Sequence, residues 1–181
     1  MRFGPVTTQD TAGRDVILRS AQAEDAKALI RYLAGTAGET PYLLREPEEV
    51  TLTAEQETAF VQRMLDAERE LMLVAMVDGE LAGTCSLTGS PFLRSRHRCE
   101  VSVALYRKFC GAGIGELLMR QILAQAEQAG YEQAELEVVA GNRGAVGLYK
   151  KLGFAEYGRF PCRMKYRDGS CADALWMMKR L

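Results

Sequence analysis

Three glycines at alternate positions mark the part of the chain best suited to bind an anion. Gly111, Gly113 and Gly115 follow a strand-like run and precede a helical pattern. The first N–H groups of a helix have no partner inside it, and the helix dipole places partial positive charge there. Glycines let a phosphate approach the backbone because no Cβ intervenes. The turn therefore predicts a pyrophosphate site, although tight strand–helix packing would also explain its glycines.

Two common nucleotide-binding loops fit this turn poorly. It is not a P-loop, because no Gly-Lys-Ser/Thr follows. The third glycine of the dinucleotide fingerprint would fall on Glu116 or Leu118. Glu135 and Glu137 do lie about twenty residues further on, where dinucleotide-binding folds carry a ribose-binding acid. A nucleotide-binding oxidoreductase is therefore a weaker alternative.

The segment from Asn142 to Phe154 argues against that alternative. Asn142 and Tyr149 are seven residues apart, which places them on one face of a helix. Together with the preceding strand, the glycine loop and a closing Gly-Phe pair, this order resembles the GCN5-related N-acetyltransferase (GNAT) family over nearly the whole chain. The resemblance implies an acetyl-CoA-dependent N-acetyltransferase, with acetyl-CoA as co-substrate. Such an enzyme transfers the acetyl group to a primary amine by direct attack in a ternary complex.

One residue of the glycine loop departs from the family pattern. Cys110 occupies the first loop position, where the family usually has arginine or glutamine. A cysteine cannot supply the same side-chain contact, so pyrophosphate binding would depend on the loop amides. Lys108, Arg107 or Arg143 would then supply compensating charge.

The resemblance also implies roles for individual residues. Tyr149 matches the general acid that protonates the leaving thiolate, and Glu100 is the candidate base, acting directly or through a water. A base is needed because a lysine-like amine, with a pKa near ~10.4, has to lose a proton before it can attack. A backbone N–H around Val101–Val103 would stabilise the oxyanion. The cofactor-binding positions implied by the resemblance are Val103, Leu105, Gly111, Gly113, Gly115 and Asn142.

Each of these roles has a plainer alternative. Tyr149 could be a core residue of its helical stripe, and Asn142 could act only as a helix N-cap. Glu100 could be a rim carboxylate paired with Arg96 or Arg98. A chain without the acid and the base would be a non-catalytic acyl-CoA-binding or regulatory module. A longer acyl donor is also open, and it would need a wider tunnel.

Histidine and cysteine usage argues against metal or triad chemistry. His97 is the only histidine, and the five cysteines include no Cys-x-x-Cys pair. A zinc site therefore has no support, and a Ser-His-Asp or Cys-His arrangement could use only that one imidazole. We expect no metal and no covalent enzyme intermediate, with His97 in a solvated loop.

The elements that must position these residues alternate between helical and strand periodicity. Asp78-Gly79 between two strand-like runs predicts a type I′ hairpin, and Asp168-Gly169 predicts a second hairpin. Thr53 and Gln56 form a capping box. Strands are expected over residues 15–19, 71–77, 80–87, 100–106, 134–140, 163–167 and 171–178. Helices are expected from Ser20 to an end marked by Gly35 and Gly38, from Thr53, from the glycine loop to Gly130, and from Asn142 to Gly153.

This order predicts an α/β fold with a mixed, mostly antiparallel sheet of about seven strands and helices on both faces. The step from Glu100 to Ala140 should be a parallel crossover. The resemblance implies the GNAT version of this architecture. Residues 1–14 are expected to form a loosely packed N-terminal extension, and residues 15–181 the acetyltransferase domain. A core of this size needs no disulfide.

Composition bounds the partners and the location. The formal net charge of −1 gives no general attraction to nucleic acid or to an anionic membrane. A cytoplasmic location is expected, since residues 1–14 carry no apolar core of signal-peptide length. The acceptor is expected to be a small-molecule amine or a protein or peptide amine, selected by the loops Gly35–Thr53 and Thr88–His97. Family members often pair through sheet edges or C-terminal strands, so a homodimer is a further expectation.

Overall fold

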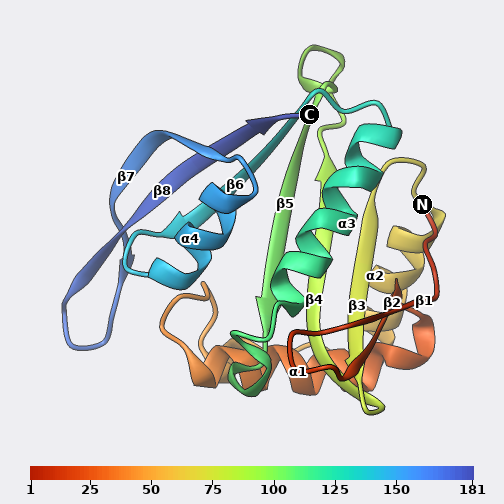
Figure 1. The fold of residues 1–181 in the computed structure, drawn as a ribbon. Coiled ribbons are helices and arrows are strands. Elements are labelled where there is room, and N and C mark those ends of the chain that lie inside the picture. Colours follow the sequence, from red (N-terminus) through yellow and green to blue (C-terminus); the bar gives the residue numbers. More distant parts are fainter.

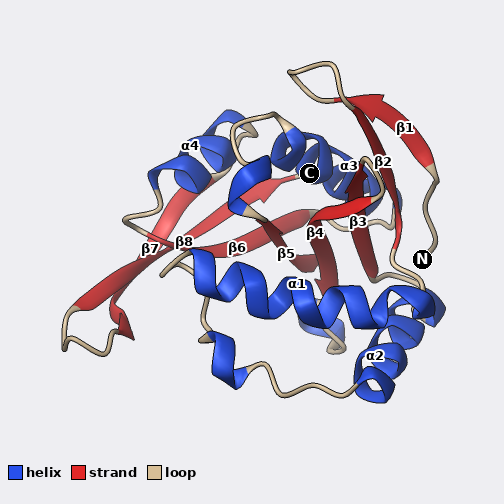
Figure 2. Ribbon diagram, turned by 90° about the horizontal axis from the view of Figure 1, so that it is seen from below, coloured by secondary structure: helices blue, strands red, loops and turns tan.

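The fold is built around one sheet with helices on both faces (Figures 1 and 2). The computed structural model describes all 181 residues. The helices are α1 (Ala26–Glu39), α2 (Ala54–Asp66), α3 (Ile114–Gln128) and α4 (Arg143–Lys151). The strands are β1 (Val6–Gln9), β2 (Asp15–Ser20), β3 (Leu71–Val77), β4 (Glu80–Gly89), β5 (Arg98–Leu105), β6 (Gln133–Val139), β7 (Ala155–Lys165) and β8 (Cys171–Arg180). None of the helices is long and apolar enough to cross a membrane.

The eight strands follow the order β1-β2-β3-β4-β5-β6-β8-β7. Only the β5–β6 pair is parallel, and every other neighbouring pair is antiparallel. The predicted class, a mixed and mostly antiparallel α/β sheet, is therefore confirmed, as is the parallel step across α3. The sheet has one strand more than the expected seven.

Two apolar clusters hold the helices against the sheet. The larger one packs the apolar stripe of α3, with Tyr149 of α4, on one face. The smaller one packs Leu29 and Tyr32 of α1 and Val61 of α2 against the other face. Figure 2 shows the same division, with α3 and α4 on one side of the strands and α1 and α2 on the other. Both faces of the central strands are therefore buried, which fits the nearly continuous apolar run of β3.

Local signals placed several elements correctly. Asp78 and Gly79 have φ of 51° and 76°, as a type I′ turn requires. The Thr53–Gln56 capping box is present at the start of α2. Gly130, with φ of 76°, ends α3. In the second hairpin, however, only Gly169 of the Asp-Gly pair has positive φ, and Tyr166 closes a longer turn with its N–H on the Ser170 carbonyl.

The N-terminal residues pack differently from the expectation. Instead of a loose extension over residues 1–14, residues 6–9 form the edge strand β1, paired with β2. Asp10 fixes the turn between them, because its carboxylate accepts hydrogen bonds from the backbone N–H groups of Ala12 and Arg14 and from the Arg14 side chain. An edge strand this short buries almost nothing, so its sequence carries no apolar alternation.

Two further boundaries were wrong for tertiary reasons, and one disulfide was not expected. The helix expected to end at Gly35 and Gly38 runs through both to Glu39. Gly35 is a packing position inside this helix, because the Tyr106 ring leaves no room for a Cβ there. The strand expected over residues 163–167 begins at Ala155, and two register shifts hide its periodicity. A disulfide joins Cys162 and Cys171 across β7 and β8, although nothing in the size of the core called for one.

A single methyl group on Gly83 should disturb the pairing of β4 with β5. A Cβ on Gly83 would lie 2.8 Å from the Ala104 carbonyl oxygen and 2.8 Å from Leu105 Cγ on the paired strand. We expect Gly83→Ala to lower the free energy of unfolding by about 1–3 kcal/mol, because overpacking forces the strands apart. Gly147→Ala is the control, since a Cβ there meets nothing within 4 Å. In the middle of α4 it should stabilise by up to ~1 kcal/mol. Urea unfolding of both variants tests this, and equal midpoints would contradict it.

Candidate active site

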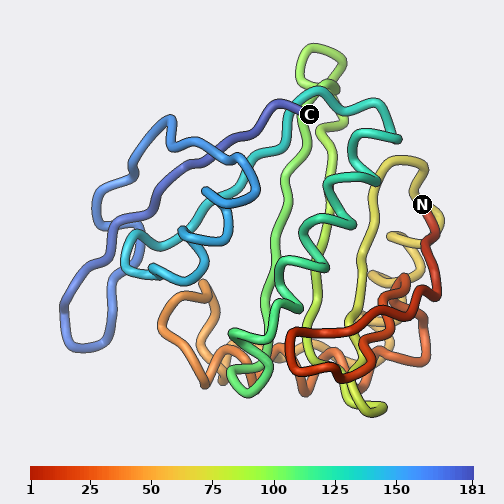
Figure 3. The backbone as a smooth tube through the Cα atoms, viewed as in Figure 1, coloured from red at the N-terminus to blue at the C-terminus, as the bar shows by residue number.

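The gap between β5 and β6 is the main opening in the sheet. These two strands pair only over Arg98–Glu100 and Gln133–Glu135. Beyond that point β6 pairs with β8 alone, while β5 stays paired with β4 as far as Leu105. Figures 1 and 3 show β5 and β6 separating along their length. The edge of β5 that faces the gap therefore has no partner strand from Val101 onward.

The register of β5 decides which of its backbone groups face the gap. Tyr106 donates its N–H to the Ala82 carbonyl on β4, whereas the His97 carbonyl accepts from Glu132 on the β6 side. Backbone direction alternates along a strand, so odd-numbered residues point away from β4. The N–H and C=O groups of Val101, Val103 and Leu105 consequently face the gap. An extended molecule could pair with them as an added strand would.

The glycine loop lies at the open end of this gap, where β5 leads through a short helical turn into α3. Gly111 and Gly113 both have φ of 81°, a conformation that favours glycine. The N–H groups of residues 111–113 donate no backbone hydrogen bond, and those of the first three residues of α3 precede its first intrahelical bond. A Cβ on Gly111 would meet no atom of the chain within 4 Å. The loop is therefore a cradle of free amide donors that opens to solvent.

Side-chain charge near the loop is scarcer than the sequence suggested. Cys110 is exposed, and partial burial together with the nearby Glu39 carboxylate raises the pKa of its thiol, so it contributes no charge at neutral pH. Lys108 is paired at 2.5 Å with Glu80, the first residue of β4. Arg143, at the start of α4, makes no ion pair. The exposed side chain of Arg107 makes no ion pair either, so Arg107 and Arg143 are the two compensating cations left free.

Tyr149 and Asn142 come from α4, on the α3 side of the sheet. Asn142 caps α4, accepting the Ala145 N–H at 3.2 Å, and its amide NH₂ donates no hydrogen bond within the chain. Tyr149 is 5% exposed and packs its ring 5.9 Å from that of Phe154. Its hydroxyl makes no hydrogen bond within the chain. Burial, with a smaller effect of the Cys85 thiol, raises the pKa of the phenol.

The opposite face of the sheet carries an acidic pocket of about 340 Å³ at the closed end of the gap. Val101 faces the buried side with α3, so Glu100, its neighbour along β5, faces the pocket side. The pocket is lined by Thr88, Gly89, Ser90, Arg98, Cys99, Glu100, Glu135, Leu136, Glu137, Tyr157 and Trp176. The acidic pocket on this face of the sheet therefore adjoins the gap between β5 and β6, which opens toward the opposite face.

Ion pairing leaves one free carboxylate in this pocket. Arg98 pairs with Glu135 at 3.0 Å. Glu137 accepts hydrogen bonds from Arg163 Nε at 2.8 Å and from the Trp176 indole N–H at 2.9 Å. Glu100 has neither an ion pair nor a hydrogen bond. The alternative in which Arg96 or Arg98 neutralises Glu100 is therefore wrong, because Arg98 turns to β6 instead.

Sequence reasoning missed the aromatic wall of the pocket. Tyr157 and Trp176 stack with ring centroids 6.3 Å apart and come from β7 and β8. Tyr157 was overlooked because the start of β7 was placed too late. The expected acceptor loops are only partly involved, since Thr88–Ser90 line the pocket while no residue of the segment 35–53 does. That segment lies at the far end of β6, where the Tyr42 hydroxyl donates to the Gly141 carbonyl.

Comparisons with known proteins agree with one another. Residues 39–154 match the model of the acetyltransferase (GNAT) family. An L-amino acid N-acetyltransferase of Escherichia coli is 22% identical over 170 residues, covering 91% of this chain and 98% of that protein. The crystal structure of a GNAT-family acetyltransferase from Streptococcus pneumoniae has a TM-score of 0.88 at 25% identity, covering 92% of this chain and 99% of that one. An acetyltransferase from Salmonella typhimurium, solved with acetyl-CoA, shares the fold at a TM-score of 0.81 and 20% identity, covering 92% of this chain and 94% of that one.

Proposed function

The chain belongs to the GNAT acetyltransferase family, and from this premise we propose how its own residues divide the work of acetyl transfer. The enzyme moves an acetyl group from acetyl-CoA to an amine. Acetyl-CoA supplies the activated acetyl group as a thioester. The open amide cradle and the unpaired edge of β5 fit such an elongated, phosphate-bearing molecule. We assign the gap to the donor and the acidic pocket to the amine.

Donor binding is assigned mainly to the backbone. The amides around Gly111, Gly113 and Gly115 hold the pyrophosphate, since free N–H groups at a helix N-terminus bind anions. Val103 and Leu105 present N–H and C=O groups to the pantetheine arm, and the free amide of Asn142 adds a hydrogen bond. None of these contacts needs the arginine or glutamine side chain that the family usually has at the position of Cys110. The departure at Cys110 is therefore compatible with binding.

Glu100 is the observation that carries the acceptor assignment. It is the pocket carboxylate left unpaired, and it stands where β5 and β6 begin to separate. An ammonium group would be drawn to it and could transfer its proton to it, directly or through a water. The neutral amine would then attack directly in a ternary complex. The next gap-facing backbone N–H groups, at Val101 and Val103, would stabilise the negative charge that develops on the carbonyl oxygen.

Tyr149 is assigned as the acid that protonates the departing thiolate. A raised pKa keeps the phenol protonated at neutral pH, and its hydroxyl has no competing partner in the chain. The acid and the base then come from opposite faces of the sheet and meet across the gap. This arrangement separates the proton that leaves the amine from the proton that reaches the sulfur.

The acceptor is proposed to be an α-amine. Support comes from the pocket size of about 340 Å³, which suits one amino-acid residue, and from the resemblance to an enzyme named for L-amino acids. A cytoplasmic location and a homodimer stay predictions. Three free cysteines agree with a reducing compartment, whereas the Cys162–Cys171 disulfide favours the opposite. The exposed edge strand β7 offers a pairing surface for a second copy.

Calorimetric titration with acetyl-CoA, followed by a screen of α-amines for CoA release, tests the proposed function. We expect Gly111→Ala to weaken acetyl-CoA binding at least about tenfold, because its Cβ enters the space assigned to the pyrophosphate. Gly130→Ala is a matched control at the other end of α3, with φ of 76° and nothing within 4 Å of a Cβ. Both variants should lose similar stability, roughly 1–2 kcal/mol. Equal acetyl-CoA affinity in the two variants would remove the loop from the donor site.

A further inference from the structure

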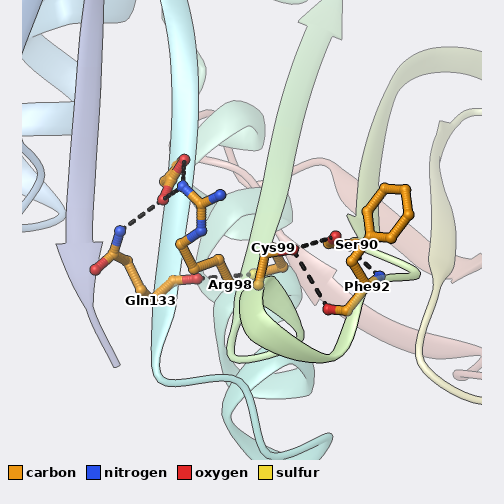
Figure 4. A network of polar contacts seen from close by, with 7 residues as sticks. Ser90, Phe92, Arg98, Cys99 and Gln133 are labelled. Atoms are coloured by element: carbon orange, nitrogen blue, oxygen red, sulfur yellow. Dashed lines mark hydrogen bonds and ion pairs between the residues drawn. The ribbon is translucent and has the colours of Figure 1, made fainter.

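The loop between β4 and β5 presents apolar side chains to solvent. Phe92 is 72% exposed and Leu93 is 83% exposed, the two highest values among the large hydrophobic residues. Figure 4 shows the Phe92 ring beside Ser90. Contiguous exposed apolar residues on a folded protein commonly mark an interaction site. Neither the donor gap nor the acidic pocket accounts for them.

Hydrogen bonds hold this loop in one shape. The Ser90 and Ser95 hydroxyls are 2.6 Å apart, and the Phe92 N–H donates to Ser90 Oγ at 3.3 Å. The Ser95 N–H donates to the Phe92 carbonyl at 3.1 Å, which closes a short helical turn. The two apolar side chains therefore stand on an ordered turn. Docking a partner there therefore costs little free energy for ordering the loop.

The same loop is positively charged in a protein that is slightly acidic. Between Ser90 and Cys99 the sequence has three arginines and no acid, against a net charge of −1 for the whole chain. Arg98 is paired with Glu135. Arg94 and Arg96 make no ion pair. Two free guanidinium groups beside exposed Phe92 and Leu93 complement a surface that is both acidic and apolar.

The loop borders the mouth of the acidic pocket. Ser90 and Arg98 line that pocket, and Tyr157 and Trp176 line it as well. Phe160 packs against Trp176 at 5.8 Å between ring centroids. Five of the ten exposed large hydrophobic residues of the protein thus line the pocket or lie next to its lining: Phe92, Leu93, Tyr157, Phe160 and Trp176. A small amine held inside the pocket would not reach this surface, whereas a longer acceptor would.

We propose that residues 90–97 dock the polypeptide that carries the acceptor amine, through an acidic and apolar segment close behind its amino terminus. The proposal rests on the proposed function, because it takes the acidic pocket as the amine site. A polypeptide places its terminal amine in the pocket while the following residues cross the loop. A bilayer resting on Phe92 and Leu93 would instead cover the pocket mouth.

Two hexapeptides that begin with the same residue test this proposal. In the acidic peptide the following residues are Glu and Leu, and in the basic peptide Lys replaces each Glu. The amide of that first residue serves as the small acceptor. We expect kcat/KM for the acidic peptide to exceed that for the basic peptide by at least about tenfold, and to fall with added salt. Arg94→Glu/Arg96→Glu should remove this preference through KM, and Phe92→Ser/Leu93→Ser should raise KM for both peptides. Neither variant should change kcat/KM for the single-residue amide that serves as the small acceptor.

Arg2→Glu/Lys27→Glu is the control, with the same change of charge at two exposed positions outside the pocket lining. The proposal is overturned if both peptides react no better than the amide, or if the loop variants slow the amide equally. It is also overturned if Phe92→Ser/Leu93→Ser converts a dimer to a monomer in light scattering, because a second copy would then cover the loop. Failure of the proposed function is distinct, since acetyl-CoA itself would then not bind.

Discussion

Tyr149→Phe is expected to lower kcat by roughly 10²- to 10⁴-fold, the usual contribution of a positioned acid. The affinity for acetyl-CoA should stay within about twofold of the original, because the loss falls on the proton transfer and not on ground-state binding. The physical reason is the state of the phenol: burial raises its pKa, so it is protonated and able to donate throughout the neutral range. Steady-state CoA release at saturating amine measures the effect.

The chain contains a matched control for this prediction. Tyr32 is also a buried tyrosine with a raised pKa and a hydroxyl without a partner, but it packs under α1 on the other face of the sheet. Tyr32→Phe should leave kcat unchanged. Both substitutions keep the ring, so both should fold with similar unfolding midpoints. If the two variants had the same kcat as the unmodified enzyme, Tyr149 would be a core residue without a chemical role.

Glu100→Gln is expected to lower kcat/KM by roughly 10²-fold or more at neutral pH, because the amide cannot take a proton from the acceptor ammonium. The deficit should shrink as pH rises toward the pKa of the free amine, ~7.7–8.0 for an α-amine, since the amine then reaches the site already neutral. Initial rates from about pH 6 to 10 with an α-amine acceptor measure both effects. The expected result is a loss of kcat/KM that becomes smaller as the pH rises.

A matched change of charge separates chemistry from electrostatics. Glu132→Gln removes one carboxylate just before β6, at an exposed position outside the pocket. It should change kcat/KM less than about twofold, because exposed charges at a distance are screened. A Glu100→Gln deficit that stayed constant across the pH range would assign Glu100 to binding the ammonium instead of removing its proton. No deficit at all would remove Glu100 from the mechanism.

Much of the proposed donor site could be predicted from the sequence because its signals are local. Gly111 and Gly113 adopt positive φ in a strand–turn–helix whose residues are adjacent in the chain. The cap at Asn142 and the turn at Asp78-Gly79 likewise depend on a few neighbouring residues. Along β5 the exposed Glu100 and the buried Val101 face opposite sides of the sheet, as the two-residue period of any strand requires. In each case the conformation follows from which residue types can adopt it, whatever the rest of the chain does.

The acidic pocket, which we propose holds the acceptor amine, was decided by tertiary structure. Glu137 lies beside Arg163 and Trp176 only because β6, β8 and β7 are neighbours in that order. Strand partners and register depend on residues far apart in the chain, and two register shifts in β7 interrupt the alternation that would reveal them. The short edge strand β1 had no apolar pattern to reveal it either. The sequence by itself thus determined the family, the amide cradle and the candidate acid and base. Only the folded sheet decided that β5 and β6 part at Glu100, that Arg98 leaves its carboxylate free, and that an aromatic wall faces it.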